Sequence, residues 1–467
     1  ISVPTSEHAN RADSIVTVDD VDWVLKDQAL EFTVSDEQSG IAKASISIDG
    51  KKFDDFEGDT YSLTYDDIAA GMHTIVIQAV DEVGNPSVDA DNTYKVSVDI
   101  SVPTSEHANR ADSIVTVGDV DWVLKDQPLK FTVSDDQSGV AEASISVDES
   151  KVGDFEGSEY FLAYNDLAEG ARVIAIDVAD EVGNTSVKQY PVSVDKSAPV
   201  LTVKSYSGGA SYSDTYYYTK DSATVTFSFD DGDGSGVKTH KLELVPTYPE
   251  GAAVDVTDKA IWTDAACEFT LGKADLADGE YKLVLSTVDY VGNASDLESK
   301  TVVIDTTAPE ITITYGTDFD NNFLLDIVRY FIYGKDAVTA TVSVTDANSP
   351  IVSIDTATRL TDGGKINRDS FEHSESRSGG KYTATAVYTI SAQYMNRLIV
   401  TAIDFPGNAA QLAPDTESEN NNDYNTNALL DTVAPTVTFN SPDYTSVHSS
   451  DYTVSITIAD PVVENVY

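Results

Sequence analysis

The chain has 467 residues, 41% of them hydrophobic, and a formal net charge of −50. That hydrophobic content is enough to form real cores, which excludes a disordered chain. The negative charge excludes nucleic acid and anionic membrane surfaces as partners, because both would repel the protein.

Short strands are predicted from the start of the chain. Apolar and polar residues alternate, as in strands with one buried face, at residues 15–18, 30–34, 44–48, 61–65, 74–80 and 94–98. Turn clusters separate these segments, at residues 36–40, 49–50 and 70–71. Six or seven short strands in fewer than about a hundred residues, with no helical period, favour an antiparallel β-sandwich.

The chain then repeats itself almost letter for letter. Residues 1–28 recur as 100–127 with Gly118 in place of Asp19, and the register holds without a gap as far as Asp81 and Asp180. We expect each repeat of this kind to be one structural unit. A module that is copied in series indicates a role in length, spacing or multivalency and not a single catalytic pocket.

Three short patterns mark four whole repeats. Asp-x-x-Gly-Asn begins at Asp81, Asp180, Asp289 and Asp404. Asp-x-x-x-Pro begins at Asp99, Asp195, Asp305 and Asp431. An Asp-rich turn with Ser precedes both, at residues 36–40, 135–139, 230–236 and 346–349. With Asp-x-x-x-Pro as the joint, the repeats are 1–99, 100–195, 196–305 and 306–431, followed by the start of a fifth at 432–467.

These patterns resemble the bacterial immunoglobulin-like repeats of large cell-surface proteins and adhesins. The matching frame includes a glycine before the penultimate strand, at Gly71, Gly170 and Gly279. The resemblance covers essentially the whole chain, although the Cys…Trp…Cys signature of antibody domains is missing. It implies an all-β fold of tandem immunoglobulin-like antiparallel β-sandwiches arranged as an elongated rod. It also implies an extracellular location, with attachment to the cell wall or envelope through regions outside this sequence.

The fourth repeat departs from the pattern. It lacks the glycine before the penultimate strand and carries two insertions, at residues 359–380 and 411–430. The second insertion is too polar to belong to a core, and loops of this length are commonly functional or disordered.

The recurrent aspartates are the chemistry that the repeats share. Each Asp of the Asp-x-x-x-Pro pattern ends a strand four residues before a proline, which favours a short, stiff linker. We expect the Asp-x-x-Gly-Asn turn to lie near the entrance of the next repeat. There, two or three carboxylates and backbone carbonyls can hold Ca²⁺ between repeats. The alternative is that each Asp hydrogen-bonds the backbone of its own turn.

A second calcium hypothesis concerns the third repeat. Asp231, Asp233 and Ser235 occupy the first, third and fifth positions of a calcium loop, with Gly236 at the sixth. Leu242 stands at the twelfth position, where a glutamate normally closes the loop. Carboxylates from another loop would therefore have to complete this site.

Enzyme chemistry finds little support in the sequence. The six histidines are scattered, and no zinc-protease, nucleophile-elbow or phosphate-loop motif occurs. Cys267 is the only cysteine, so no intrachain disulfide can form, and free cysteines are mostly buried. We therefore expect a protein that is not an enzyme.

Tyrosines gather in two places. Five lie between residues 206 and 218, and two tyrosines with a phenylalanine lie between residues 330 and 333. Exposed tyrosines can stack on sugars or contact proteins. Tyrosine is also an ordinary strand residue on half-buried surfaces, so a structural role is the alternative.

Two functions fit these features. The first is a stalk or adhesive region whose partner is a host or neighbouring-cell surface protein or a glycan, with lateral self-association as a further option. The second is a spacer or accessory region of a secreted carbohydrate-active enzyme. Lysine–asparagine cross-links within repeats are a third feature, which intact mass would reveal. The chain begins inside one repeat and ends inside another, so we expect a signal and an anchor elsewhere, and no membrane insertion here.

Overall fold

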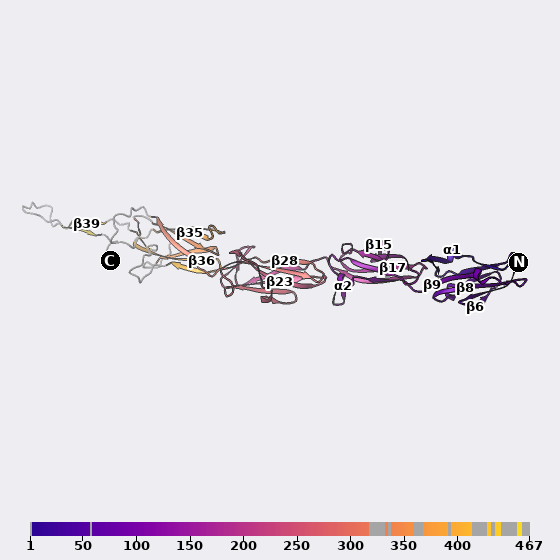
Figure 1. Ribbon diagram of the computed structural model, residues 1–467. Coiled ribbons are helices and arrows are strands. Elements are labelled where there is room, and N and C mark those ends of the chain that lie inside the picture. Colours follow the sequence, from indigo (N-terminus) through magenta and orange to yellow (C-terminus); the bar gives the residue numbers. More distant parts are fainter. Residues whose placement is uncertain are drawn as a thin grey trace, which may run out of the picture. The chain divides into compact units, whose positions relative to one another are not determined.

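The computed structural model describes residues 2–56, 58–316, 332–334, 338–358, 368–390, 394–412, 427–430, 435–439 and 455–459. The chain divides into two compact units. The first comprises Ile1–Pro199, Asp231–Thr239 and Val288–Ala294, and the second Val200–Asp230, His240–Thr287 and Ser295–Tyr467. Both are built almost entirely from β-strands (Figure 1).

The first repeat is a sandwich of two sheets, with the strand orders β1-β4-β7 and β2-β3-β9-β8-β5-β6. The strands are β1 (Thr5–His8), β2 (Ile15–Val18), β3 (Val21–Val24), β4 (Leu30–Ser35), β5 (Ile41–Ile48), β6 (Lys51–Asp55), β7 (Thr60–Leu63), β8 (Gly71–Asp81) and β9 (Thr93–Val98). Only β3 and β9 pair in parallel among the strand pairs described for this repeat. The chain starts in one sheet and crosses to the other before β4, as in an immunoglobulin-like sandwich.

The second repeat has the same two sheets, in the orders β10-β13-β16 and β11-β12-β18-β17-β14-β15. Its strands are β10 (Thr104–His107), β11 (Ile114–Val117), β12 (Val120–Val123), β13 (Leu129–Ser134), β14 (Val140–Val147), β15 (Ser150–Asp154), β16 (Glu159–Leu162), β17 (Gly170–Asp180) and β18 (Thr185–Val194). The expected fold class, tandem immunoglobulin-like antiparallel sandwiches, is confirmed.

The third repeat forms the sheets β19-β22-β26-β25 and β20-β21-β29-β27-β23-β24, with β28 paired to β27. Its strands are β19 (Val200–Ser207), β20 (Ala210–Ser211), β21 (Tyr216–Thr219), β22 (Ser222–Asp230), β23 (Val237–Tyr248), β24 (Val254–Asp255), β25 (Ile261–Trp262), β26 (Ala266–Gly272), β27 (Gly279–Asp289), β28 (Ala294–Glu298) and β29 (Thr301–Ile304).

The fourth repeat forms the sheets β30-β32-β35-β34 and β31-β38-β36-β33, with β37 paired to β36. Its strands are β30 (Glu310–Gly316), β31 (Ile332–Gly334), β32 (Val338–Asp346), β33 (Ile351–Thr358), β34 (Arg368–His373), β35 (Tyr382–Ile390), β36 (Tyr394–Asp404), β37 (Ala409–Leu412) and β38 (Asn427–Leu430). Beyond them, β39 (Thr436–Phe439) pairs with β40 (Ile456–Ala459).

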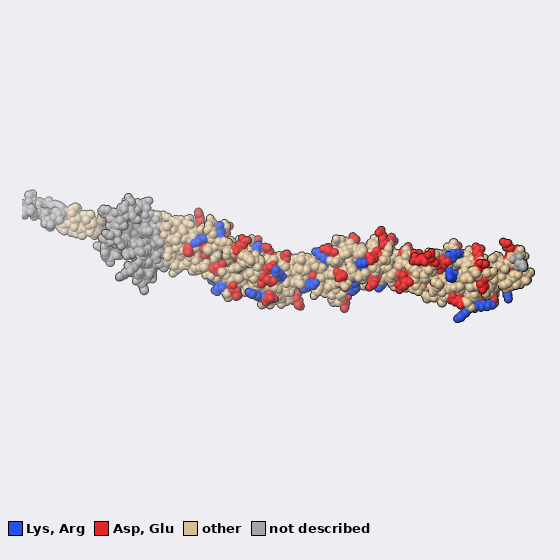
Figure 2. All heavy atoms as spheres, viewed as in Figure 1, with Lys and Arg blue, Asp and Glu red and all other residues tan. Residues whose placement is uncertain are grey.

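Helical structure in the described residues is limited to single turns. These are α1 (Arg11–Ser14), α2 (Arg110–Ser113) and the 3₁₀ turns η1 (Tyr65–Asp67), η2 (Asp89–Asn92), η3 (Tyr164–Asp166) and η4 (Thr257–Lys259). None of the helices that the structure describes has the length and apolar character needed to cross a bilayer. Acidic side chains are spread over the visible surface of the described sandwiches and outnumber basic ones (Figure 2).

Alternating side chains build each core. On β4, Leu30, Phe32 and Val34 are at most 3% exposed, while the residues between them face outward. Ile46 on β5 and Ile77 on β8 belong to the same core. Burial of each such side chain stabilises the fold by roughly 1.5–3 kcal/mol. The period of two in the sequence thus determines both the strand and its buried face.

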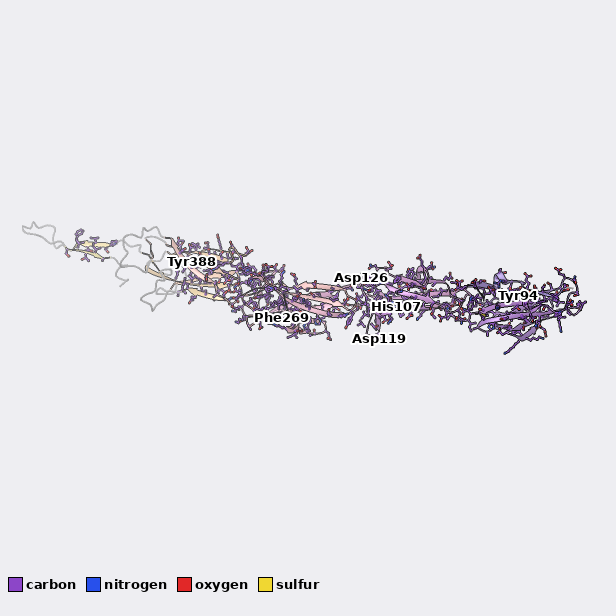
Figure 3. All side chains as sticks on the ribbon, in the orientation of Figure 1. Tyr94, His107, Asp119, Asp126, Phe269 and Tyr388 are labelled. Carbon is purple, nitrogen blue, oxygen red and sulfur yellow. The ribbon has the colours of Figure 1, made fainter. Side chains whose placement is uncertain are left out.

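The repeated histidines are core residues. His8 and His107 occupy the same position in the first two repeats, and each is 7% exposed. The ring of His107 stacks on Phe131 with centroids 4.9 Å apart, and its Nε2 lies 3.0 Å from Ser113 Oγ. Burial lowers the pKa of His107. Figure 3 marks His107 and Tyr94, an aromatic residue of the corresponding core in the first repeat.

The predicted strands of the first repeat are confirmed as β2, β4, β5, β7, β8 and β9. The alternation does not predict β1, β3 or β6, which are short, and all residues of β6 are exposed. The placement of Tyr65 in a strand is wrong, because it lies in η1. In the fourth repeat, the insertion at 359–380 contributes β34, and the end of the insertion at 411–430 forms β38, which pairs with β36. These parts of the insertions are sheet and not loop.

Candidate metal centres

Three clusters of aspartates lie at the joints between repeats. In each cluster, one carboxylate oxygen from each of three residues lies within 4.8 Å of the others. The clusters are Asp99, Asp135 and Asp180; Asp195, Asp231 and Asp289; and Asp305, Asp346 and Asp404. All members of the first two clusters belong to the first compact unit, and all members of the third belong to the second unit.

Each cluster combines one residue from the repeat before the joint with two from the repeat after it. At the first joint, Asp99 follows β9, Asp135 follows β13, and Asp180 ends β17. Strand β17 runs towards the entrance of its own repeat and β18 returns to the exit, so the turn between them lies beside Asp99. The expectation that this turn serves the next joint is therefore wrong, because it serves the joint before its own repeat.

The Asp-x-x-Gly-Asn turn is organised by its own aspartate. Asp180 Oδ1 accepts the backbone N–H groups of Val182, Gly183 and Asn184 at 3.1, 2.7 and 2.7 Å. Gly183 has a φ of 101°, a left-handed conformation that favours glycine. Asn184 Nδ2 donates to Asp180 Oδ2 at 2.8 Å and to the backbone oxygen of Asp99 at 3.0 Å. The expected turn chemistry is thus present, and the same asparagine links the turn to the preceding repeat.

Asp99 is fully buried and connects the first two repeats. Its Oδ1 accepts the N–H of Ser101 at 2.8 Å, and its Oδ2 accepts the N–H and the hydroxyl of Ser138 at 3.0 and 2.7 Å. Burial raises the pKa of Asp99, but the hydrogen bonds from Ser101 and Ser138 outweigh burial, so the pKa lies below its ordinary value. Tyr65 donates its hydroxyl to the backbone oxygen of Asp99.

A backbone hydrogen bond also recurs at the first two joints. The N–H of Lys26 donates to the oxygen of Val182 at 2.8 Å. One repeat later, the N–H of Lys125 donates to the oxygen of Val291 at 3.0 Å. The Asp-x-x-Gly-Asn turn therefore docks on the preceding repeat through main-chain as well as side-chain groups.

The second joint preserves most of this arrangement. Asp195 Oδ2 accepts the N–H of Ser235 at 2.7 Å. The backbone oxygen of Asp195 accepts Asn293 Nδ2 at 3.0 Å and the hydroxyl of Tyr164 at 2.8 Å. Ser235 is 3% exposed, and its hydroxyl has no hydrogen-bond partner within the described part of the chain. The hydroxyl of Ser235 is therefore buried but does not donate to the joint aspartate, as the hydroxyl of Ser138 does at the first joint.

At the third joint, Asn408 Nδ2 of the fourth repeat donates to the backbone oxygen of Asp305 at 2.9 Å, but no backbone N–H of the Ser-containing turn bonds the Asp305 carboxylate among the described residues. Asp305 Oδ1 accepts the N–H and hydroxyl of Thr307 at 3.2 and 3.0 Å. Asp305 Oδ2 is buried and has no hydrogen-bond partner among the described residues, and the same holds for the hydroxyl of Ser349. The N–H of Ser349 donates instead to Asp346 Oδ1, at 2.8 Å. Two polar groups that face this joint are therefore left unsatisfied.

The third cluster brings three buried carboxylates together, and the pKa of each is raised. Asp305 and Asp404 are fully buried and Asp346 is 4% exposed. In the part of the chain that the structure describes, no lysine or arginine forms an ion pair with any of them. Burial, and then the neighbouring carboxylates, raise the pKa of Asp404 to about 7. Burial also raises the pKa of Asp305 and Asp346.

The geometry of the clusters suits a calcium ion. Ca²⁺ takes six to eight oxygen ligands at about 2.3–2.6 Å. Three oxygens within 4.8 Å of one another can all lie on a sphere of that radius. Buried charges without a counter-ion cost several kcal/mol, so a cation or a proton must offset the third cluster. The unsatisfied Asp305 Oδ2 and Ser349 hydroxyl are oxygen ligands of the kind that Ca²⁺ takes.

The structure sorts the site residues expected from the sequence. It brings together Asp99 with Asp180, Asp195 with Asp231 and Asp289, and Asp305 with Asp404. Asp81 accepts Asn85 Nδ2 at 2.7 Å in its own turn and belongs to none of the three described clusters. Asp233 is exposed and also lies outside them, whereas Ser235 contributes its N–H. Asp431 lies outside the described residues.

Sequence reasoning missed two members, Asp135 and Asp346. Both begin the Ser-containing turn that recurs in every repeat, so the signal was present in the pattern. The pattern does not show that this turn and the Asp-x-x-Gly-Asn turn lie at the same end of the sandwich. That proximity follows from the strand order and is visible only in the fold.

Substitution of Asn184 by Ala is expected to destabilise the second repeat more than Asn85 by Ala destabilises the first. Asn85 Nδ2 donates within its own turn, whereas Asn184 Nδ2 also bonds Asp99 of the preceding repeat. The difference should be about 1–2 kcal/mol, the worth of one buried hydrogen bond. The chain has three tryptophans, so urea unfolding of versions that keep only Trp23, in the first repeat, or only Trp122, in the second, assigns each transition. Equal losses in the free energy of unfolding in the two variants would contradict a stabilising hydrogen bond between the repeats.

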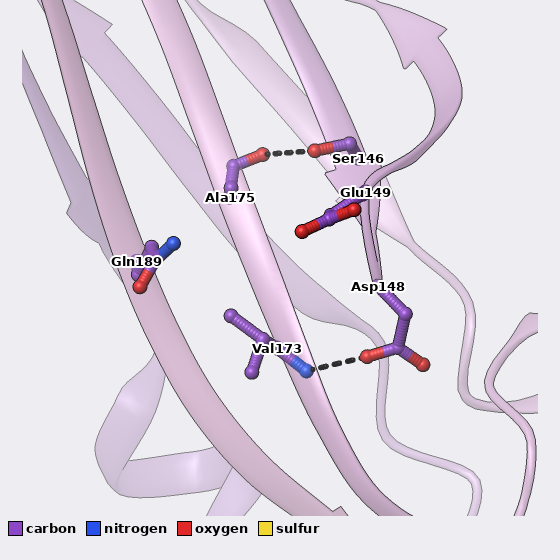
Figure 4. Close-up of a pocket in the computed structure, with 6 residues that line it drawn as sticks. All are labelled: Ser146, Asp148, Glu149, Val173, Ala175 and Gln189. Carbon is purple, nitrogen blue, oxygen red and sulfur yellow. Dashed lines mark hydrogen bonds between the residues drawn. The ribbon is translucent and has the colours of Figure 1, made fainter.

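A separate hollow of about 360 Å³ lies on the second sandwich. Its lining consists of Ser146, Asp148, Glu149, Val173, Ala175 and Gln189 (Figure 4). Ser146 donates its hydroxyl to the oxygen of Ala175 at 3.5 Å, and the N–H of Val173 donates to Asp148 at 2.9 Å. These polar groups serve the sheet, so we place the candidate site at the joints.

The tyrosines of the third repeat have structural roles. Tyr217 and Tyr218 are 6% and 1% exposed, and Tyr206 stacks on Tyr217 with centroids 5.1 Å apart. The hydroxyl of Tyr206 accepts the N–H of Lys300 at 2.6 Å. The structural alternative is therefore confirmed for these residues. In the fourth repeat, Tyr330 and Phe331 lie outside the described residues, as does the side chain of Tyr333.

Comparison with known proteins gives structural matches only. No family model and no curated protein sequence matches the chain. A tetra-tandem repeat from the extending region of a large adhesion protein is 16% identical, with a TM-score of 0.31, and the match covers 88% of this chain and 99% of that one. A 1.5-MDa bacterial ice-binding adhesin is 13% identical, with a TM-score of 0.29, and the match covers 60% and 92%. The protocadherin gammaB7 EC3-6 cis-dimer is 14% identical, with a TM-score of 0.24, and the match covers 87% and 96%.

Proposed function

We propose that the chain is part of an extracellular stalk of tandem immunoglobulin-like modules whose joints are stiffened by bound Ca²⁺. The observation that supports this most is the acidic triad, which recurs at three successive joints in the same sequence positions. A cation at a joint ties the carboxylate of one repeat to two carboxylates of the next. It also offsets self-repulsion in a chain with a net charge of −50.

A stalk explains why the modules are copied with so little change. Each repeat has its own core and meets the next through a short linker that ends in proline. Such a chain holds an adhesive region at a distance from the cell that bears it, within reach of a protein or glycan on a host or neighbouring cell. Cys267 is buried, so the modules fold without disulfides.

Calcium titration of the whole chain tests the proposal. Calorimetry is expected to detect at least one ion for each of the three described clusters. Saturation at a hundred times the dissociation constant would stabilise a repeat by about 2.7 kcal/mol. Small-angle scattering should show a longer particle with calcium than with chelator. Mg²⁺ should have less effect, because it requires a stricter octahedral geometry and dehydrates reluctantly.

Two variants separate the joints from the calcium loop hypothesis. Asp289→Asn removes a member of the second cluster, whereas Asp233→Asn removes an exposed residue outside it. Loss of one bound ion in the first variant and not in the second supports a joint site. If calcium neither binds nor raises the melting temperature, the aspartates are turn residues only and the proposal is wrong.

A further inference from the structure

The third joint carries an aromatic contact between repeats. Tyr218 of the third repeat is 1% exposed, and its ring lies edge-on to Phe405 of the fourth repeat with centroids 5.3 Å apart. Its hydroxyl lies 3.4 Å from that of Tyr382, also in the fourth repeat. Tyr212 meets Phe405 edge-on from a second side, at 4.9 Å. Such aromatic pairs stabilise an interface beyond the effect of the apolar area that they bury.

An arginine completes the contact. The guanidinium of Arg377 in the fourth repeat lies 4.0 Å from the ring centroid of Tyr248 and forms a 2.9 Å ion pair with Glu280, both in the third repeat. Their side chains are 15% and 11% exposed. Arg377 Nε donates to the oxygen of Ala347 at 2.9 Å, and its guanidinium lies 5.5 Å from the ring centroid of Tyr382. The arginine is therefore anchored in its own repeat and bonded to the preceding one.

The earlier joints have different residues at these positions. Alignment of Lys125 with Lys220 places Val123 opposite Tyr218. Alignment of the Asp-x-x-Gly-Asn patterns places Glu181 at the first joint and Tyr290 at the second joint opposite Phe405. Arg377 lies within the insertion at 359–380, for which the first two repeats have no counterpart. The third joint thus differs from its predecessors in sequence as well as in contacts.

We propose that the third and fourth repeats are held as one body by this Arg377–aromatic interface, whether or not their acidic cluster holds a cation. The first joint, in contrast, loosens when its cation is removed. This behaviour of the first joint rests on the proposed function. Removing one partner of a largely buried ion pair is strongly destabilising, and a desolvated cation–π contact adds to the stability of an interface. Neither interaction needs a metal ion.

Spin-label distances across two joints of the whole chain test this inference. One pair of labels spans the first joint, at cysteines that replace the exposed residues Lys43 and Glu142. The other pair spans the third joint, at cysteines that replace the exposed residues Thr270 and Glu372. Cys267 is fully buried, and burial raises the pKa of its thiol to about 12, so it escapes labelling. In chelator, the distance distribution at the third joint should stay as narrow as in calcium. At the first joint it should broaden.

Variants of Arg377 test whether this arginine keeps the third-joint distance distribution narrow. Arg377→Ala in chelator should broaden the third-joint distribution to the width of the first joint. Arg377→Lys keeps the charge for Glu280 but loses the planar stacking, so it should broaden the distribution less. Arg172→Ala is the matched control, because Arg172 forms an ion pair of the same length, 2.9 Å, with Asp148 inside one repeat. It should change neither distribution.

Each outcome separates the two proposals. A third joint that broadens in chelator with Arg377 intact, or that stays narrow in Arg377→Ala, overturns the interface as the lock. A first joint that does not respond to calcium overturns the calcium-stiffened stalk and leaves the third-joint result standing. Because each repeat has its own core, circular dichroism and the melting curve of each variant distinguish a fourth repeat that fails to fold from a joint that has only loosened.

Discussion

Without a bound cation, the repeats that meet at the third joint are expected to melt at a lower temperature at pH 7.5 than at pH 5, and calcium is expected to remove the difference. The pKa of Asp404 is raised from 3.8 to about 7, and those of Asp305 and Asp346 are also raised. Between about pH 4 and 7 the folded state therefore binds more protons than the unfolded state. Stability then falls as the pH rises, by up to about 1.4 kcal/mol per pH unit for each proton. Calorimetry in chelator at several pH values measures the slope.

Asp346→Asn is the variant that tests the cause. The amide carries no charge, and its NH₂ group can donate to Asp305 Oδ2, which has no partner in the described structure. In chelator at pH 7.5 this variant should melt higher than the unsubstituted chain, with a flatter dependence on pH. In calcium it should melt lower, because one ligand is lost. A variant that melts lower under both conditions would show that repulsion between the carboxylates does not control the stability of this joint.

Asp99→Asn is expected to cost the first joint about 3 kcal/mol at neutral pH. The carboxylate of Asp99 accepts hydrogen bonds from Ser101 on one oxygen and from Ser138 on the other. An asparagine amide keeps only one oxygen acceptor. Its NH₂ group would face the N–H groups of Ser101 or Ser138, which also donate. The pKa of Asp99 is lowered, so its contribution is present above the unfolded pKa near 3.8 and is lost as the pH falls through the folded value. The difference in the free energy of unfolding between the variant and the unsubstituted chain should therefore become smaller in acid.

The first and third joints should thus respond to acid in opposite directions. Urea unfolding at pH 7 and at pH 3.5, with Trp122 as the reporter of the second repeat, measures the effect of Asp99→Asn. Asp112→Asn is the control, since it removes one charge from an exposed position of the same repeat. A loss below about 1 kcal/mol at neutral pH, the worth of an ordinary exposed interaction, would contradict the structural role of Asp99.

The repeat pattern and the period of two predict most of the fold. Alternation identifies the strands that line the core, because burial of Phe32 or Ile46 requires a residue of that kind at every second position. It does not identify β6, whose residues are all exposed, or β1, in which His8 alone is buried. The structure adds the order of the strands within each sheet, which depends on contacts between residues far apart in the sequence.

The candidate site is predicted in part. The repeat pattern identifies Asp99, Asp195 and Asp305 as joint residues and associates them with the Asp-x-x-Gly-Asn turns. It assigns those turns to the wrong joint, since the end of the sandwich at which a turn lies depends on strand direction. It also cannot show that Arg377 of the fourth repeat meets Glu280 of the third, because no local pattern couples an insertion to a strand of another repeat.

The position of the Asp-x-x-Gly-Asn turn has a consequence for how such a gene changes in number of copies. The backbone oxygen of Asp99, at the end of one repeat, accepts a hydrogen bond from Asn184 of the next repeat. A duplicated or deleted block that runs from one Asp-x-x-x-Pro pattern to the next therefore adds or removes one accepting aspartate and one donating asparagine together. Unequal recombination between the nearly identical first and second repeats can lengthen or shorten the protein while every remaining junction keeps a matched pair. The third and fourth repeats, bound by residues found only there, stay outside that exchange.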